Sequence, residues 1–335
     1  MVEPKLPPLP TRTADAWELS PAFEKTDPIF SVSAHAGRVL VGGSLGLHRL
    51  RAGDLQWQHR DLPGGVSSAW KVALEPWAPW RAAVGCEEGL AIFLGPEGGG
   101  RIAHVRPKGE RVDVRDIAWG RVGKRAVLYV VWENGELARL YPETQEQEVL
   151  DVPDVGALAT DGSGSVAMFD WEQWRVFLAD PQGNMRFRAP EFSKEWYESL
   201  PDPIDVPAHL AVAGRAVAFS IGWHGAFLSR DIDTEPLVRC EPLGLAGALA
   251  FEGRTSDAAL LAAPDGESAS SIVRVDASGH ATRVGDMLPV SGAAVPFDQI
   301  AWDDSRKKLF CVHRQAGVVV ATAPDAKDGK LAAPN

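Results

Sequence analysis

The chain alternates between short apolar runs and polar turns along most of its length. One pair of runs reads VLVGGSLGLHRL from Val39, and another reads YVVWENGELARLY from Tyr129. Alternation of apolar and polar residues within such runs is typical of half-buried strands and not of helices. A polar turn joins the two runs of each pair, and the second run usually begins at Gly. The pattern therefore predicts a series of β-hairpins.

This hairpin unit recurs seven times, which indicates a repeat architecture. The residues at which the second run begins are Gly46, Gly89, Gly135, Trp174, Gly225, Ser270 and Gly317. They are separated by 43, 46, 39, 51, 45 and 47 residues. A period of about 40–50 residues is typical of a four-stranded propeller blade. The sequence therefore predicts an all-β fold, a seven-bladed β-propeller of four-stranded antiparallel blades.

The residues around each hairpin supply the other two strands of a blade. A short apolar run precedes the hairpin, as in Asp116–Trp119, His209–Val212 and Gln299–Trp302. A turn such as Asp180–Gly183 follows it and leads into an outer strand. Asp and Gly are common in such turns because Asp bonds the nearby backbone and Gly accepts a positive φ.

The first residues of the chain are predicted to close the ring. The seventh copy ends near Ala323 with three strands, and Ala16–Ser20 alternates like an outer strand. A blade shared by both chain ends leaves no open sheet edge. We therefore expect a Pro-rich N-terminal leader over 1–15, one propeller domain over 16–323 in which 16–20 completes blade seven, and a flexible C-terminal tail over 324–335.

Two segments carry a resemblance to a known family that covers nearly the whole chain. Ile300–Leu309 and Asp116–Trp119 resemble the first strand and turn of bacterial WD40-like and YVTN-like propellers. The chain departs from WD40 repeats because its Trp302–Asp303 pair lies on a different strand from the family's Trp-Asp pair. The resemblance implies the architecture and no cofactor. By analogy it also implies work beside a partner such as an ATPase or a von Willebrand-type domain protein.

Charge and cysteine content narrow the possible partners and the compartment. With 45 acidic against 34 basic residues, the net charge of −11 disfavours nucleic acid and anionic membranes as partners. The first ten residues, MVEPKLPPLP, do not read as a secretory signal, and no run approaches the roughly 18 apolar residues of a membrane span. Three widely separated cysteines read as buried, reduced side chains of a cytoplasmic protein.

Motifs for common chemistries are missing from the sequence. Eight histidines are scattered without a paired metal-ligand spacing, and neither a P-loop nor a GxSxG turn occurs. Asp161–Gly164 resembles a fragment of a calcium loop but has too few carboxylates, and it reads better as a tight turn between strands. The sequence therefore predicts no metal and no cofactor, and it identifies no candidate catalytic residue.

Aromatic residues, in contrast, gather in the predicted loops on one face of blades three to five. The connection Pro190–Asp205 is 16 residues long and rich in aromatic side chains. Loops longer than about 12 residues in compact domains are usually functional or disordered, and Trp and Tyr commonly anchor protein interfaces. The alternative is that this loop caps the propeller and seals its core. The predicted protein-binding residues are Trp132, Trp171, Trp174, Phe192, Trp196, Tyr197, Trp223 and His224.

Charge is also distributed unevenly beside these loops. Residues 101–125 hold eight basic and three acidic side chains, whereas residues 133–161 hold eight acidic side chains and one arginine. Such patches are often merely solvated, but they can also orient a partner. We therefore expect a non-catalytic interaction subunit of a cytoplasmic bacterial multiprotein assembly. Two alternatives stay open: a propeller enzyme (a lyase, lactonase or glycosidase) with an axial active site, and a propeller that binds a sugar or another small ligand.

Overall fold

A computed structural model describes most of the chain as strands joined by turns and loops. The described residues are 18–23, 28–50, 57–62, 66, 68–78, 81–87, 89–93, 102–105, 112–152, 154–170, 175–187, 209–220, 225–235, 237–240, 247–253, 258–265, 269–286, 299–313 and 317–324. None of these residues belongs to a helix, and so this part of the chain contains no helix suited to crossing a membrane.

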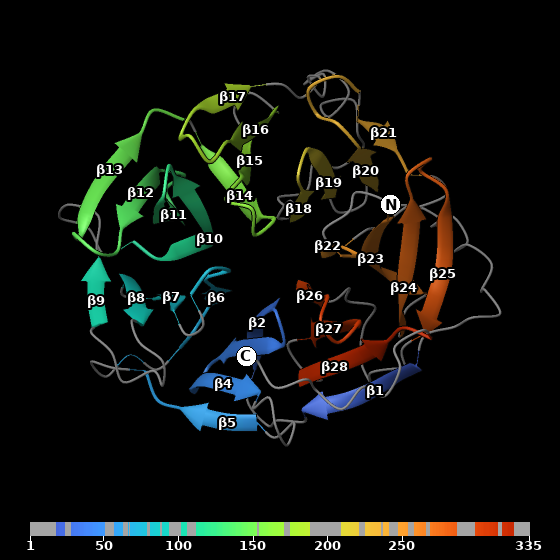
Figure 1. Ribbon diagram of the computed structural model, residues 1–335. Coiled ribbons are helices and arrows are strands. Elements are labelled where there is room, and N and C mark those ends of the chain that lie inside the picture. The colour runs from blue at the N-terminus through green and yellow to red at the C-terminus, as the bar shows by residue number, and fades with distance from the viewer. Residues whose placement is uncertain are drawn as a thin grey trace, which may run out of the picture.

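The described strands form seven four-stranded antiparallel sheets that stand around a central axis (Figure 1). In six of the sheets the four strands follow one another in chain order from the axis to the rim. This arrangement confirms the predicted all-β, seven-bladed β-propeller. We number the blades 1 to 7 along the chain, beginning with the sheet that contains β2.

Each blade contributes its innermost strand to the wall around the axis. The inner strands are β2 (Ile29–His35), β6 (Lys71–Leu74), β10 (Val114–Val122), β14 (Val155–Thr160), β18 (His209–Ala213), β22 (Leu249–Phe251) and β26 (Gln299–Asp303).

The next two strands of each blade form the hairpin that the sequence repeat predicts. The second strands are β3 (Arg38–Gly43), β7 (Ala82–Cys86), β11 (Arg125–Trp132), β15 (Val166–Asp170), β19 (Ala216–Ser220), β23 (Ala258–Asp265) and β27 (Lys308–His313). The third strands are β4 (Gly46–Leu50), β8 (Gly89–Phe93), β12 (Leu137–Tyr141), β16 (Arg175–Ala179), β20 (Ala226–Ser229), β24 (Ala269–Asp276) and β28 (Gly317–Thr322).

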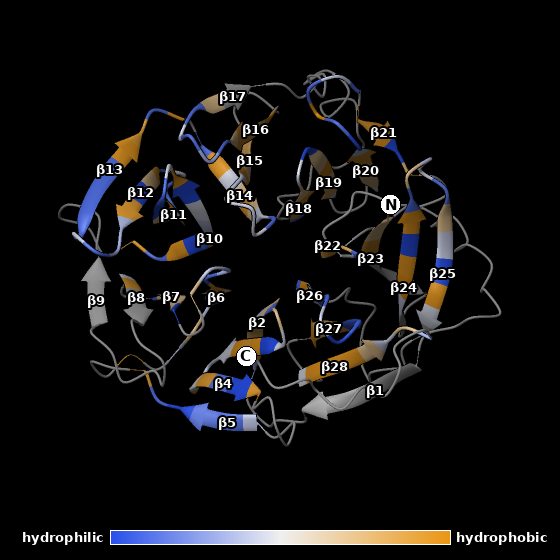
Figure 2. Cartoon of the chain, in the orientation of Figure 1, coloured by the Kyte–Doolittle hydropathy of each residue, from blue (hydrophilic) through white to orange (hydrophobic). Residues whose placement is uncertain are grey.

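The outer strands form the rim of the ring, and several of them are largely solvent-exposed. All of β13 except its last residue is exposed, and both residues of β21 are exposed. In Figure 2 the outer strand β5 is accordingly mostly hydrophilic, whereas β28 is largely hydrophobic. The outer strands are β5 (Trp57–Arg60), β9 (Ile102–Val105), β13 (Glu146–Leu150), β17 (Met185–Phe187), β21 (Val238–Arg239), β25 (Ala281–Asp286) and β1 (Glu18–Phe23).

A glycine stands at or just before the start of the third strand in five of the seven blades, because the turn there needs a left-handed backbone. Gly46 has φ of 112° and Gly135 has φ of 82°. A side chain at such a φ is strained, and glycine is not. The hairpin pivots that the sequence places at these glycines are thus confirmed together with their physical reason.

The N-terminal strand closes the ring, as the sequence predicts. β1 pairs with β28 in the antiparallel direction, and the sheet order is β1-β28-β27-β26. Glu18 lies opposite Thr322, so the first described strand covers the edge of the third strand of blade 7. The strand spans Glu18–Phe23, slightly later in the chain than the predicted Ala16–Ser20.

The hydrophobic core of the described residues is divided among the seven interfaces between blades. Each of its seven clusters draws side chains from two neighbouring blades, and one joins Phe310 of blade 7 to Val41 of blade 1. Trp119 is fully buried and Trp302 is 9% exposed, so both rings belong to this core.

The three cysteines are free and buried, as the sequence predicts. Burial also raises the pKa of the Cys311 thiol, which keeps this sulfur in its protonated, unreactive form.

Removal of the closing strand should make the protein associate with itself. A chain that lacks residues 1–23 loses β1 and exposes the apolar edge of β28, and uncovered edges of this kind template aggregation. We expect an earlier elution in size-exclusion chromatography and a lower melting temperature. A chain that lacks only residues 1–15 keeps β1 and serves as the control. Unchanged behaviour of the longer deletion would contradict the role of β1 in closure.

Candidate functional site

A channel with a volume of about 1390 Å³ follows the axis, and inner strands of all seven blades line it. Each inner strand is hydrogen-bonded to its second strand along one edge and turns its other edge toward the channel. Backbone N–H groups on such an edge have no strand partner, and they need acceptors from elsewhere.

Side chains from the preceding blade supply acceptors to several of these edges. The Oε1 atom of Gln299 in blade 7 accepts a hydrogen bond from Val32 N–H of blade 1 at 3.1 Å. The Oγ atom of Ser31 in blade 1 accepts one from Val72 N–H of blade 2, also at 3.1 Å. Gln299 Oε1 accepts a further bond from the Ser31 hydroxyl at 2.6 Å, so three blades are linked in a row.

Asp116 performs the same task between blades 3 and 4. Its Oδ2 atom accepts a hydrogen bond from Leu158 N–H at 2.8 Å, and its Oδ1 atom accepts one from Ile117 N–H at 3.0 Å. Lys71 Nζ lies 3.8 Å from Asp116 Oδ1, a loose ion pair between blades 2 and 3. The carboxylate is thus held by two backbone groups and one charge.

These side chains occupy equivalent places in a short sequence pattern. Each inner strand contains a variable residue, then a buried aliphatic residue, then alanine, which serine replaces in blade 1. The pattern is visible in the sequence, but which position reaches the neighbouring blade is visible only in the structure. The variable residues are Ser31, Lys71, Asp116, Ala157, His209, Ala248 and Gln299.

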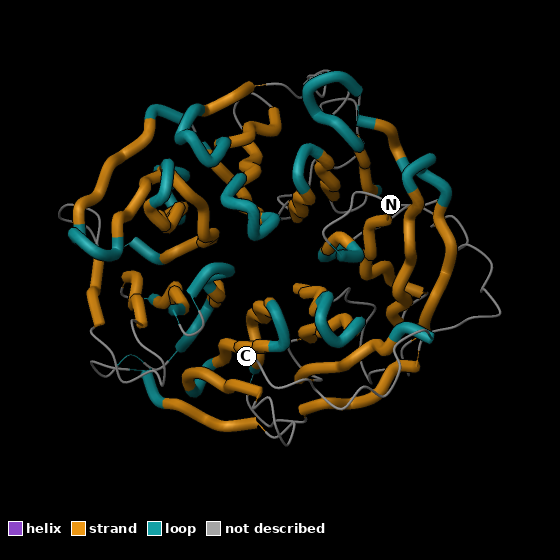
Figure 3. The backbone as a smooth tube through the Cα atoms, in the orientation of Figure 1, coloured by secondary structure: helices purple, strands orange, loops and turns teal. Residues whose placement is uncertain are grey.

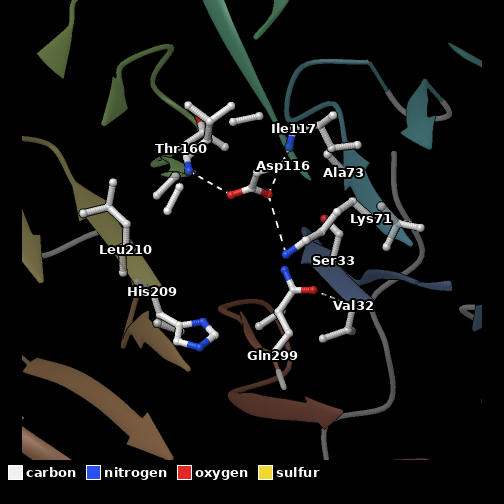
Figure 4. A pocket seen from close by; sticks show the side chains of 18 of the residues that line it. Val32, Ser33, Lys71, Ala73, Asp116, Ile117, Thr160, His209, Leu210 and Gln299 are labelled. Atoms are coloured by element: carbon white, nitrogen blue, oxygen red, sulfur yellow. Dashed lines mark hydrogen bonds and ion pairs between the residues drawn. The ribbon is translucent and has the colours of Figure 1, made fainter. Parts of the chain in front are cut away.

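His209 lines the channel at the start of β18 and is partly exposed to it. Burial lowers the pKa of His209 to about 4, and the positive charge of Lys71 acts in the same direction. The imidazole is therefore neutral at pH 7. Figure 4 shows its ring directed into the space that Lys71 and Gln299 face from the other side.

A hydrogen bond links turns of two non-adjacent blades at the end of the channel where the inner strands finish. The Trp77 indole N–H of blade 2 donates a hydrogen bond to the Gly162 carbonyl of blade 4 at 2.9 Å, and the Arg121 guanidinium lies 4.1 Å from the centre of the Trp77 ring. A Cβ on Gly162 would lie 3.4 Å from His35 Cε1 of blade 1. Turns of three blades thus meet here, and Figure 3 shows the loops after β6 and β14 projecting toward the axis.

Trp132 differs from its predicted place in an exposed loop. It is the last residue of β11, is 1% exposed, and packs in one cluster with Trp119 and Leu128. Trp132 therefore belongs to the core between blades 2 and 3 and does not present its ring to a partner.

The other predicted protein-binding residues fall outside the described part of the chain, so their assignment stays a prediction. The described strands nevertheless fix where the long connection begins and ends. It leaves the outer strand of blade 4 at Phe187 and returns at His209, which lines the channel. The residues in question are Trp171, Trp174, Phe192, Trp196, Tyr197, Trp223 and His224.

The channel offers a binding surface to which His209 contributes a neutral imidazole. Among the described residues, His, Cys, Asp and Glu side chains do not gather in threes as a metal site would require. The carboxylate of Asp116 already accepts two backbone hydrogen bonds. His209 and Lys71, which sequence analysis missed, present polar groups to the channel that a bound molecule can reach.

Replacement of Asp116 by Ala should destabilise the ring. The change leaves two backbone N–H groups without their acceptor, and hydrogen bonds to charged groups contribute about 1.5–3 kcal/mol each, less where water replaces them. We expect a clear drop in the free energy of unfolding, measured with urea. Asp151→Ala removes an exposed carboxylate and should change this energy by less than about 0.5 kcal/mol. Equal effects of the two substitutions would contradict the role of Asp116.

His209 should make the protein less stable in mild acid. The unfolded chain takes up a proton at its ordinary pKa near 6.5, while folded His209 resists protonation until about pH 4. Its contribution to the free energy of unfolding is therefore complete above pH 6.5 and is lost as the pH falls toward 4. His209→Gln should reduce the difference in stability between pH 7.0 and pH 5.0, measured by urea unfolding. An identical difference in both proteins would show that His209 titrates normally.

The chain resembles known proteins in structure but not in sequence. No family model matches it, and no curated protein matches it in sequence. Among solved structures, the RRP9 WD40 repeats align over 94% of this chain and 99% of theirs, with 12% identity and a TM-score of 0.66. A streptogramin B lyase aligns over 92% and 98%, with 9% identity and a TM-score of 0.68.

A third similar chain comes from the mitotic checkpoint complex. It aligns over 96% of this chain and 94% of its own length, with 13% identity and a TM-score of 0.66. Identities this low show a shared fold and nothing finer. The chain is a seven-bladed β-propeller whose structural neighbours include both WD40-repeat proteins and lyases.

Proposed function

We propose that this propeller is a non-catalytic interaction subunit that binds a partner protein on the loop face of blades 3 to 5. The observation that supports the proposal most is the use of polar side chains around the channel. Gln299, Ser31 and Asp116 all bond the backbone of a neighbouring blade, and they therefore serve to hold the ring rigid. A rigid ring positions its loops for docking with little loss of conformational entropy.

The described part of this face is acidic at blade 3. The turn that follows β11 exposes Glu133, and the nearby Asp154 is 52% exposed in its side chain. Arg115 lies 3.8 Å from Asp154 and neutralises part of this charge. A partner with basic side chains would match the face, since complementary charge steers association.

The similar structures agree with a role in assembly. One similar chain is part of the mitotic checkpoint complex, so a propeller of this shape takes part in a multiprotein assembly there. The three buried, free cysteines suit a reducing compartment, and the proposal therefore places the subunit in a cytoplasmic assembly. An ATPase or a von Willebrand-type domain protein is the kind of partner that the family resemblance suggests.

The double substitution Trp196→Ala/Tyr197→Ala tests the proposal. These rings lie in the connection between β17 and β18, where interface anchors are predicted. We expect the variant to melt like the parent protein and to lose binding by about 2 kcal/mol or more, roughly a 30-fold weakening. The measurement combines thermal melting with affinity capture from the native host and mass spectrometry.

Two further variants make the result decisive. Val238→Ala alters a 50% exposed side chain on the rim of blade 5 and should keep every partner. Trp119→Ala removes a fully buried ring whose indole N–H bonds the Ala73 carbonyl, at a cost of about 3–5 kcal/mol in stability. If the loop variant melts as early as the Trp119 variant, the loop is a structural cap and the interface proposal fails.

A further inference from the structure

The side-chain oxygens of Gln299 and Asp116 on the channel wall already accept hydrogen bonds. Gln299 Oε1 accepts hydrogen bonds from Val32 N–H and from the Ser31 hydroxyl. Both carboxylate oxygens of Asp116 accept backbone N–H groups. The oxygens of Gln299 and Asp116 are therefore not available to a molecule in the channel.

The NH2 group of Gln299 and the ammonium group of Lys71 are donors available to a bound molecule. Because backbone N–H of Val32 can bond only an oxygen, the orientation of the Gln299 amide is fixed and its NH2 group points away from that bond. Lys71 carries three N–H donors, has one contact at 3.8 Å with Asp116, and is 33% exposed in its side chain. In Figure 4 the nitrogen atoms of Gln299 and Lys71 point to the same part of the channel.

His209 adds a donor from the opposite wall. Its imidazole makes no hydrogen bond with the described residues, and its ring points toward Lys71 and Gln299 across the channel (Figure 4). A neutral imidazole always carries one N–H donor. Donors from blades 2, 5 and 7 thus face the channel where the inner strands begin.

Two inner strands add backbone N–H donors to the channel wall. The residues equivalent to Val32 and Leu158 in blades 5 and 7 are Leu210 and Ile300. The variable residue of the blade before each is alanine, which has no acceptor to offer. The backbone N–H groups of Leu210 and Ile300 therefore receive no side-chain acceptor from the variable residue of the preceding blade.

The remaining surroundings limit the charge and shape of the molecule that matches these donors. Three carboxylates of the channel wall, Asp113, Glu133 and Asp154, belong to the same end and would repel a polyanion. Phe30 and Trp70 also line the channel and stack with ring centres 4.4 Å apart, which provides flat apolar surface. The volume of about 1390 Å³ exceeds the about 300–1,000 Å³ of common ligand pockets.

We propose that the channel binds a small organic monocarboxylate, whose oxygens accept hydrogen bonds from Lys71, Gln299 and His209 and whose apolar part lies toward Phe30 and Trp70. This site uses side chains of the inner strands, whereas the partner protein is assigned to the loops at the same end of the ring, so the two proposals are tested with different residues. The two proposals therefore succeed or fail separately.

Calorimetric titration of the intact protein with benzoate tests the site. We expect saturable binding of benzoate in the millimolar range or tighter, and at least tenfold weaker binding of benzyl alcohol and of benzylamine. Lys71→Met should weaken benzoate binding about tenfold or more, since hydrogen bonds between charged groups are the strong ones. Lys124→Met, at an exposed turn between β10 and β11, should leave it unchanged.

A second variant isolates the donor of Gln299 from its structural acceptor. Gln299→Glu keeps an oxygen for Val32 N–H and replaces the NH2 donor by a second oxygen, so the ring should keep its melting temperature while benzoate binding falls at least tenfold. No saturable binding of benzoate by the parent would overturn the proposal. Preference for benzylamine, or benzoate binding that survives both Lys71→Met and Gln299→Glu, would overturn it as well.

Discussion

The structure depends on how the free edges of seven inner strands are satisfied. An unpaired strand edge exposes backbone N–H groups that need an acceptor or water. In part of the ring the acceptor comes from the preceding blade, as when Gln299 bonds the backbone of Val32 and Asp116 bonds that of Leu158. The bond that satisfies an edge therefore also fixes two blades relative to each other. The same polar side chains therefore satisfy the strand edges and hold neighbouring blades together. The NH2 group of Gln299, with Lys71 and His209, supplies the donors of the channel.

Apolar packing acts at the same interfaces. Every core cluster of the described residues lies between two blades, and none is confined to a single sheet. A blade therefore has no hydrophobic core of its own, and its stability depends on both neighbours. Closure by β1 is needed for the same reason: without it the last sheet would lack its outer strand. The hydrogen bond from Trp77 to Gly162 adds a contact between blades 2 and 4, which are not adjacent in the ring.

Much of the fold is predictable from the sequence because blades are local units. Five pivot glycines mark their hairpins directly, since a turn with positive φ favours glycine, and the period near 45 residues predicts the other two. The channel is less predictable, because Ser31 and Gln299 meet across 268 residues and only ring closure brings them together. Trp132 illustrates a different limit. Its place next to a polar turn suggests a loop, yet Leu128, Val130 and Trp132 share the buried face of one strand, and strand period 2 carries this signal.

The pairing of the two chain ends has a mechanical consequence. Glu18 at the start of β1 lies opposite Thr322 at the end of β28, so both chain ends leave blade 7 at the same corner of its sheet. A force that pulls the ends apart acts on one hydrogen-bonded pair at a time and peels β1 away like a zipper, because the strands are antiparallel. Strands loaded along their length would instead share the force among all their bonds. An unfolding machine that pulls on either end therefore acts first on the sheet of blade 7. It opens this blade before it disturbs the other six.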